Sequence, residues 1–184
     1  MPKSKKVVAI VGMAGSGKTE VARAFEKHGF TRVRFGDVTD EELHKQGLAL
    51  NEDNERHIRE LLRKEHGMAA YAKLNLPRIE SALKNSNVVV DGLYSWEEYI
   101  LLKDHYGVDF TVIAVWASPE MRYARLSSRS ERPLNQKEAS SRDRTEIENT
   151  NKGGPIAMAD YTIGNESSLS DLKEQVNKLL ARLK

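Results

Sequence analysis

The stretch from Gly12 to Thr19 has the residue types and the spacing of a phosphate-binding loop, fitting G-x-x-x-x-G-K-[ST]. Glycines let a backbone turn its N–H groups toward phosphate oxygens, and the positive end of the following helix adds to the attraction. Lys18 can reach the β- and γ-phosphates, and the Thr19 hydroxyl can hold Mg²⁺. The sequence therefore predicts a site for ATP and Mg²⁺. We assign cofactor binding here to Gly12, Ala14, Gly15, Ser16, Gly17, Lys18, Thr19 and Glu20.

A second acidic element, Asp91, closes the apolar run 88–90. An acidic side chain at the carboxyl end of a buried parallel strand points into the crevice where open α/β sheets bind ligands. Beside the phosphate loop it would hold Mg²⁺ or its waters. The alternative is a turn aspartate, because Asp-Gly is a common turn pair and Gly92 follows.

Arginines recur after the fourth predicted strand. Arg122, Arg125 and Arg129 have three- and four-residue spacing, which predicts that they share one helix face. Arginines that close over a reacting phosphate stabilise its charge and exclude water, so we interpret this group as part of a lid. The alternative is a solvated basic face. The polar segment that follows adds Arg132, Arg142 and Arg144.

An earlier basic row is open to two interpretations. Arg56, Arg59 and Arg63 could hold the phosphate of an acceptor molecule. Glu52 and Glu55 precede the first two of them by four residues, which is also the pattern of an ordinary exposed helix.

The whole chain limits the classes of function. It has 184 residues, a net charge of +2, and no cysteine, which excludes disulfides, thiolate zinc sites and thiol nucleophiles. Its histidines are scattered, and no apolar run approaches the length of a membrane span. The charge is too small to indicate nucleic acid, and no aromatic residues are interleaved with the basic segments. We expect a cytoplasmic protein.

Five apolar runs alternate with helical segments, which indicates a parallel sheet between helical layers. We predict a three-layer α/β/α P-loop fold with about five parallel strands, in one domain spanning 1–184. A helical insertion at 40–85 and a polar segment at 129–154 stand apart from this core. The predicted strands lie within 5–12, 31–37, 86–92, 109–118 and 159–165.

One alternative class of P-loop protein can be rejected. A GTPase would carry the guanine-reading motif N-K-x-D after an apolar strand. The stretch Asn151 to Gly154 begins with Asn-Lys but lacks the aspartate and follows polar residues.

Longer motifs give the chain a family resemblance. They are "FGD" at 35–37, "LLRKEHGMAAYA" at 61–72, "VVVDGLYSWEEY" at 88–99 and a block at 141–176 that runs from "SRDRTE" to "ADYTIGN". With the phosphate loop, they make nearly the whole chain resemble the nucleoside monophosphate kinase group of P-loop proteins. It is most similar to the adenylate kinase-related and dephospho-CoA kinase-like set of archaea and bacteria. The resemblance implies that 40–85 binds the phosphate acceptor and that 129–154 is the lid.

The resemblance also implies roles for individual positions. Asp37 would orient or deprotonate the attacking oxygen, and Asn165 would lie near the adenine. Asp37 could equally cap a helix, Tyr71 could simply pack in the core, and Asn165 could merely end a strand. The implied acceptor site is Gly36, Asp37, Arg63, Gly67 and Tyr71, and the implied contacts to donor phosphates are Arg125, Arg129 and Arg142.

One position departs from the family pattern. Many relatives have an arginine soon after the Gly-Asp pair, where it binds the acceptor phosphate. This chain has Asp40 there and no arginine nearby, and a carboxylate would repel a phosphate. Either the Arg56–Arg63 row replaces that arginine, or the acceptor is not an ordinary nucleoside monophosphate.

The leading hypothesis is an ATP- and Mg²⁺-dependent kinase that transfers the γ-phosphoryl group in line to a nucleotide-like small molecule. The acceptor would be a nucleoside or deoxynucleoside monophosphate, or a hydroxyl such as that of dephospho-CoA. The alternative is a nucleotide-dependent binding or assembly factor with weak ATPase activity. We expect a monomer or a homodimer. The proposed catalytic residues are Lys18, Asp37, Asp91, Arg125, Arg129 and Arg142.

Overall fold

The three central strands are continuous apolar runs because each is packed on both faces, whereas the two edge strands each bury one residue. In β1 (Val7–Val11) every residue is buried. The odd-numbered residues enter one hydrophobic core and the even-numbered residues enter another. A parallel strand covered by helices on both sides therefore needs a continuous apolar run rather than an alternating one.

The computed structural model describes residues 5–183. Its sheet has five strands, all parallel, in the order β2-β3-β1-β4-β5. The predicted α/β class and parallel sheet are confirmed. The other strands are β2 (Thr31–Arg34), β3 (Val88–Asp91), β4 (Phe110–Trp116) and β5 (Tyr161–Gly164).

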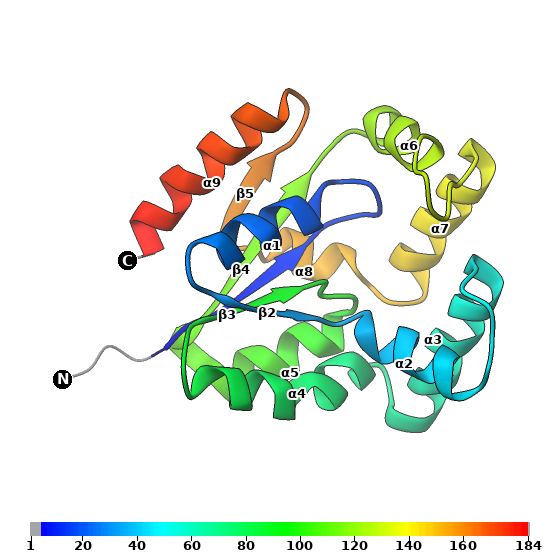
Figure 1. Cartoon of the computed structure of the whole chain (residues 1–184), viewed down its shortest axis with the longest axis horizontal. Helices are drawn as coiled ribbons and strands as arrows, with labels where there is room; N and C mark the ends of the chain where they lie inside the picture. Colours follow the sequence, from blue (N-terminus) through cyan, green and yellow to red (C-terminus); the bar gives the residue numbers. More distant parts are fainter. Residues whose placement is uncertain (1–4, 184) are drawn as a thin grey trace.

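Helices cover both faces of the sheet (Figure 1). On one face, α1 (Lys18–Lys27) and α9 (Leu169–Leu183) bury Phe25 and Val176 in the same core as Val89 of β3. On the other face, α4 (Ala70–Leu83) and α5 (Trp96–Tyr106) lie together beneath the strands, followed by a short 3₁₀ helix at Gly107–Asp109.

Most of the remaining helices gather where the strands end (Figure 1). After β2 come α2 (Asp37–Lys45) and α3 (Glu52–His66), and after β4 come α6 (Pro119–Ser127), α7 (Gln136–Glu148) and α8 (Gly153–Ala157). Of these, α8 instead packs with α5 against the sheet. The segment 40–85 thus holds most of α2, all of α3, and the core helix α4. Its role as an acceptor-binding insertion, and that of 129–154 as a lid, stay predictions.

The lid helix has a well-defined start. Asn135 accepts a hydrogen bond from the backbone N–H of Glu138, whose side chain accepts one from the backbone N–H of Asn135. This capping box satisfies two donors that a helix start would leave free. It fixes where α7 begins, and Ala139 of this helix packs in a small core with Leu126 of α6. Within residues 5–183, no helix is both long enough and apolar enough to cross a bilayer.

Candidate active site

The predicted phosphate loop connects β1 to α1 at the middle of the sheet edge. Gly17 has a φ of +99°, and a Cβ placed on it would lie 2.3 Å from the Asn165 side-chain nitrogen. Gly15 has a φ of +81°, and its Cβ would lie 2.7 Å from the Arg122 carbonyl oxygen. Both the backbone conformation and the space therefore require glycine.

Lys18 is the first residue of α1, and its ammonium group donates a hydrogen bond to the carbonyl oxygen of Met13 at 2.9 Å. Burial, reinforced by the positive charge of Lys152, lowers the pKa of Lys18 to about 7. Thr19 follows on the exposed side of the loop. Glu20 is also exposed and pairs with Arg23 at 2.7 Å.

Side chains from α6 and from the residue after β5 hold the loop in place. The amide of Asn165 donates to the Ser16 carbonyl oxygen at 2.8 Å. Arg122 of α6 donates to the Ala14 carbonyl oxygen at 3.1 Å, and Arg125 donates to the Asn165 carbonyl oxygen at 2.9 Å. Asn165, expected near the adenine, thus has its amide against the loop itself. Within the described residues, the second guanidinium nitrogen of Arg125 is buried without a hydrogen-bond partner.

Asp91 lies at the end of β3, buried, and close enough to Lys18 to act on its charge. Arg32 of β2 donates two hydrogen bonds to Asp91 Oδ2, the one from Nε at 3.0 Å. Sequence reasoning missed Arg32. The available signal was its position in the run Thr31-Arg32-Val33-Arg34, where alternation puts both arginines on the same sheet face as Asp91.

The donor set suits Mg²⁺ rather than a metal held entirely by protein. Among residues 5–183 no cluster of three or more acidic, histidine or cysteine side chains could hold a metal ion. Mg²⁺ usually takes one or two protein ligands together with phosphate oxygens and waters. The exposed hydroxyl of Thr19 and the carboxylate of Asp91 fit that pattern.

The predicted lid segment contributes an ion-pair network centred on Glu146 of α7. Its carboxylate accepts from Lys152 Nζ at 2.8 Å and from Arg142 Nε at 3.3 Å. Burial alone would raise the pKa of Glu146, but the positive charges of Lys152 and Arg142 outweigh it and lower the pKa to about 2. Glu146 and Lys152 both lie in the family block at 141–176, but sequence reasoning gave no role to Glu146 and considered Lys152 only within a rejected guanine motif.

The lid also touches the predicted acceptor segment. Arg142 donates to Glu52 of α3 at 3.1 Å, and Arg132 bonds to Glu55 of the same helix. Glu52 is shared with Arg59, which donates to it at 2.6 Å. These contacts bring the segments 40–85 and 129–154 together over the sheet edge.

The predicted arginine face is partly wrong. Helix α6 ends at Ser127, so Arg129 lies beyond it in an exposed segment. Partial burial of its guanidinium lowers the pKa of Arg129, and the nearby positive charges of Arg142 and Arg132 lower it further. Arg122 is buried and pairs with Asp143. In the outer part of α7, Arg144 is exposed and pairs with Glu148 at 2.8 Å.

An arginine does contact the aspartate of the Gly-Asp pair, but this arginine precedes the pair in the sequence. Arg34 at the end of β2 donates to Asp37 at 2.7 Å and to Asp40 at 2.6 Å. Gly36 precedes α2, and Asp37 is the first residue of that helix. Arg34 therefore neutralises in part both Asp37 and Asp40, the residue that departs from the family pattern.

Tyr71 is fully buried, and its hydroxyl shares a hydrogen bond of 2.6 Å with Thr39. It lies in the core rather than at an open surface. The guanidinium of Arg63 lies 5.5 Å from the centre of its ring, and within the described residues Arg63 Nε is buried without a hydrogen-bond partner. Gly67 ends α3 with a φ of +81°.

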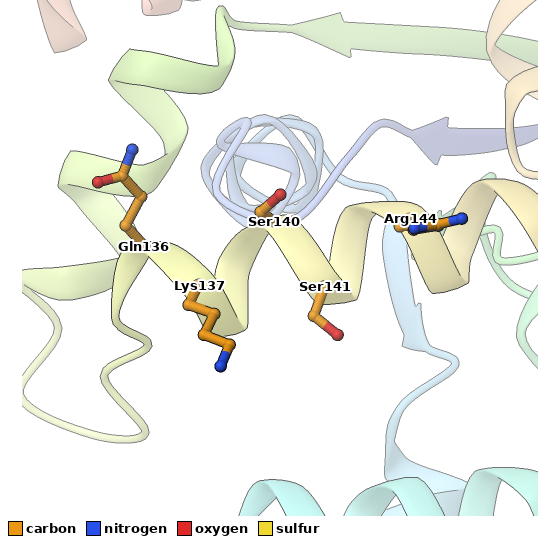
Figure 2. A pocket seen from close by; sticks show the side chains of 5 residues that line it. All are labelled: Gln136, Lys137, Ser140, Ser141 and Arg144. Atoms are coloured by element: carbon orange, nitrogen blue, oxygen red, sulfur yellow. The ribbon is translucent and has the colours of Figure 1, made fainter.

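A hollow of about 560 Å³ lies along the outer side of α7 (Figure 2). Helical spacing puts Arg142 and Glu146 on the opposite side of the same helix. The hollow therefore belongs to the outer surface of the lid. The five residues that line it are Gln136, Lys137, Ser140, Ser141 and Arg144.

Comparison with known sequences matches residues 8–148 to a family described as an AAA domain. Over 181 residues the chain is 35% identical to a UPF0200 protein of Thermococcus sibiricus, covering 96% of this chain and 95% of the relative. It is 35% identical over 185 residues to a UPF0200 protein of Methanococcus vannielii, covering 97% and 96%.

Comparison with solved structures confirms the predicted P-loop kinase fold. A gluconokinase from Sinorhizobium meliloti has a TM-score of 0.63 at 16% identity, covering 98% of this chain and 94% of that one. A shikimate kinase from Bacteroides thetaiotaomicron has a TM-score of 0.62 at 14% identity, covering 97% and 98%. A dephospho-CoA kinase from Campylobacter jejuni has a TM-score of 0.56 at 13% identity, covering 99% of each chain.

Proposed function

Because this chain belongs to the UPF0200 family, and because its AAA domain carries a braced phosphate loop beneath a charged lid, we propose that it is an ATP- and Mg²⁺-dependent small-molecule kinase. The observation that carries the proposal is the convergence at one sheet edge. Lys18 lies in the loop, Arg142 belongs to the lid, and Arg142 also pairs with Glu52 of the predicted acceptor segment.

Phosphoryl transfer requires positioning and charge neutralisation more than covalent chemistry. Lys18 binds the β- and γ-phosphate oxygens, and the loop N–H groups surround them. Arg125, Arg129 and Arg142 neutralise charge that spreads over the transferred group, and the lid excludes water. Thr19 and Asp91 would hold Mg²⁺, which would neutralise part of the negative charge of the phosphates.

On the acceptor side, Asp37 positions the attacking oxygen and takes its proton if that oxygen belongs to a hydroxyl. Arg63, with its buried unpartnered nitrogen, binds an anionic group of the acceptor. Arg34 already serves two carboxylates, so it supports Asp37 rather than binding a free phosphate. This arrangement favours an acceptor that reacts through a hydroxyl, such as dephospho-CoA, over a nucleoside monophosphate.

The test is turnover of ATP to ADP with Mg²⁺ against a panel of acceptors. The panel holds the common nucleoside and deoxynucleoside monophosphates, dephospho-CoA, gluconate and shikimate, with a reaction lacking acceptor. We expect one acceptor to stimulate turnover strongly, and Lys18→Ala to reduce that turnover by at least about 100-fold. Lys27→Ala, exposed on the same helix, is the matched control and keeps wild-type turnover.

Slow hydrolysis that no acceptor stimulates would contradict the kinase proposal. If Lys18→Ala also abolished that hydrolysis, the nucleotide-dependent binding factor would be favoured, and pull-down of partners with and without ATP would be the next step.

A further inference from the structure

Lys152 has an unusual position for a lysine. It lies between α7 and α8, and its side chain is 2% exposed. Its backbone N–H donates to the Glu146 carbonyl oxygen at 3.2 Å, which folds the connection back onto the last turn of α7. The preceding residue, Asn151, has a φ of +50°, a conformation that asparagine tolerates better than most residues. The ammonium group is thus held by a defined turn.

Neighbouring contacts make that turn rigid. The backbone N–H of Trp96 donates to the Thr150 carbonyl oxygen at 3.2 Å. On the other side of Lys152, a Cβ on Gly154 would lie 2.6 Å from the Trp96 ring, so the chain packs closely there. The backbone on both sides of Lys152 therefore packs against Trp96, the first residue of α5.

The surroundings of Lys152 contain more positive than negative charge. Its ammonium contacts Glu146 at 2.8 Å, but Glu146 also serves Arg142 at 3.3 Å. Lys152 and Glu146 both act on the charge of Lys18 in the phosphate loop. Glu146 therefore lies among three cations. Asp91 also acts on the charge of Lys18 but is already paired with Arg32, and the buried Glu98 acts with Lys152 from the side of Tyr94. Burying an extra cation beside Lys18 is unfavourable unless an anion joins them.

The ammonium also faces the acceptor side of the site. It lies 5.4 Å from the centre of the Tyr94 ring, and Tyr94 packs edge-on against Tyr71 with ring centres 5.2 Å apart. The Tyr94 hydroxyl would lie 3.4 Å from a Cβ on Gly36, beside Asp37. Lys152 is therefore placed between the phosphate loop and the residues that would hold the acceptor.

We propose that Lys152 is a second phosphate-binding lysine, which contacts the γ-phosphoryl group on the side that faces the acceptor, and that Glu146 is the counter-ion that this group displaces. The proposal rests on the proposed kinase function and adds a residue to its site. The γ-phosphate and the Glu146 carboxylate compete for the same donors, so Glu146 sets how tightly a triphosphate binds.

The test compares the binding of a non-hydrolysable β,γ-imido analogue of ATP with that of ADP, both with Mg²⁺, by isothermal titration calorimetry. We expect Lys152→Met to weaken analogue binding by about tenfold or more, because a charge-assisted hydrogen bond is lost, and to weaken ADP binding much less. We expect Glu146→Gln to tighten analogue binding by several-fold. Lys137→Met, exposed on the lid helix, is the control and binds both nucleotides as the wild type does.

A second variant separates binding from folding. Lys152→Met leaves Glu146 without its closest partner, so the double variant Lys152→Met/Glu146→Gln removes both charges together. We expect it to keep the wild-type melting temperature and still to discriminate less between analogue and ADP. Lys152→Arg retains the cation and restores part of the discrimination.

Wild-type affinity of Lys152→Met for both nucleotides, or an equal loss for both, would overturn the role of Lys152 and leave the kinase proposal standing. Tighter binding by Lys152→Met or weaker binding by Glu146→Gln would overturn it as well. Failure of the wild type to bind either nucleotide would instead refute the proposed function.

Discussion

Arg122 and Asp143 form a buried ion pair with two parallel hydrogen bonds, of 2.8 and 2.6 Å. The pair joins α6 to the lid helix α7. The same guanidinium donates to the Ala14 carbonyl oxygen of the phosphate loop and to the Ala117 carbonyl oxygen after β4, each at 3.1 Å. One side chain therefore ties the loop, the sheet and the lid together.

We expect Asp143→Ala to destabilise the protein by about 3–5 kcal/mol, because it leaves the Arg122 guanidinium buried without its counter-ion. Urea denaturation measures this. Glu148→Ala breaks the exposed pair with Arg144 on the same helix and costs less than about 1 kcal/mol. Equal losses from the two substitutions would show that the buried pair has no special role.

Gly17→Ala tests the shape of the phosphate loop, and Gly29→Ala is its control. Both residues have positive φ, +99° and +87°, so both substitutions carry a similar conformational cost of about 1 kcal/mol. Only at Gly17 does the new Cβ meet a neighbour, the Asn165 amide. We expect ATP affinity, measured by calorimetry, to fall by at least about tenfold for Gly17→Ala. Equal affinities for the two variants would contradict this reading of the loop.

Glu98 makes stability depend on pH. It is fully buried and accepts the Tyr94 backbone N–H at 2.8 Å. Burial raises its pKa from an ordinary 4.5 to about 7, although that N–H partly opposes the shift. A raised pKa contributes stability that is complete below pH 4.5 and is lost as pH rises through 7.

We therefore expect the wild type to lose up to about 3 kcal/mol between pH 4.5 and 7 relative to Glu98→Gln, which stays neutral throughout. Chemical denaturation at several pH values measures the difference. Asp104→Asn, exposed on the same helix, keeps the wild-type slope. Parallel curves for wild type and Glu98→Gln would show that burial does not shift the pKa of Glu98.

Glu52→Gln tests whether ion pairs hold the lid over α3. Glu52 accepts from both Arg142 and Arg59, so removing its charge weakens the link between the two segments. We expect faster amide hydrogen exchange in residues 136–148, by several-fold, and no change in the strands. Glu60→Gln, exposed on the same helix, gives wild-type exchange. Unchanged exchange in Glu52→Gln would mean that packing alone positions the lid.

Sequence patterns predicted the central strands and the phosphate loop, because the local sequence alone determines these features. The apolar runs around Val8, Val89 and Ile113 identified three central strands, because burial on both faces leaves no other composition. The phosphate loop was identified because its glycines are required by backbone conformation at Gly15 and Gly17.

Long-range partners could not be predicted in the same way. Arg32 and Asp91 are 59 positions apart, and only strand order brings them together. Lys152 appeared polar and exposed because no apolar residues surround it in the sequence, yet the turn after α7 buries it. The end of α6 at Ser127 moved Arg129 off the predicted helix face, since helix ends depend on the chain that follows.

The edge position of β2 has an evolutionary consequence. The phosphate loop leaves β1, which is held between two strands, whereas α2 and α3 leave β2, which pairs only with β3. Mutations in α2 and α3 can therefore accumulate with little disturbance to the nucleotide-binding centre. For the proposed kinase, selection can then change the phosphate acceptor while the residues proposed to bind ATP stay the same. Divergence among paralogues is expected to concentrate between residues 37 and 66, at the β2 edge of the sheet.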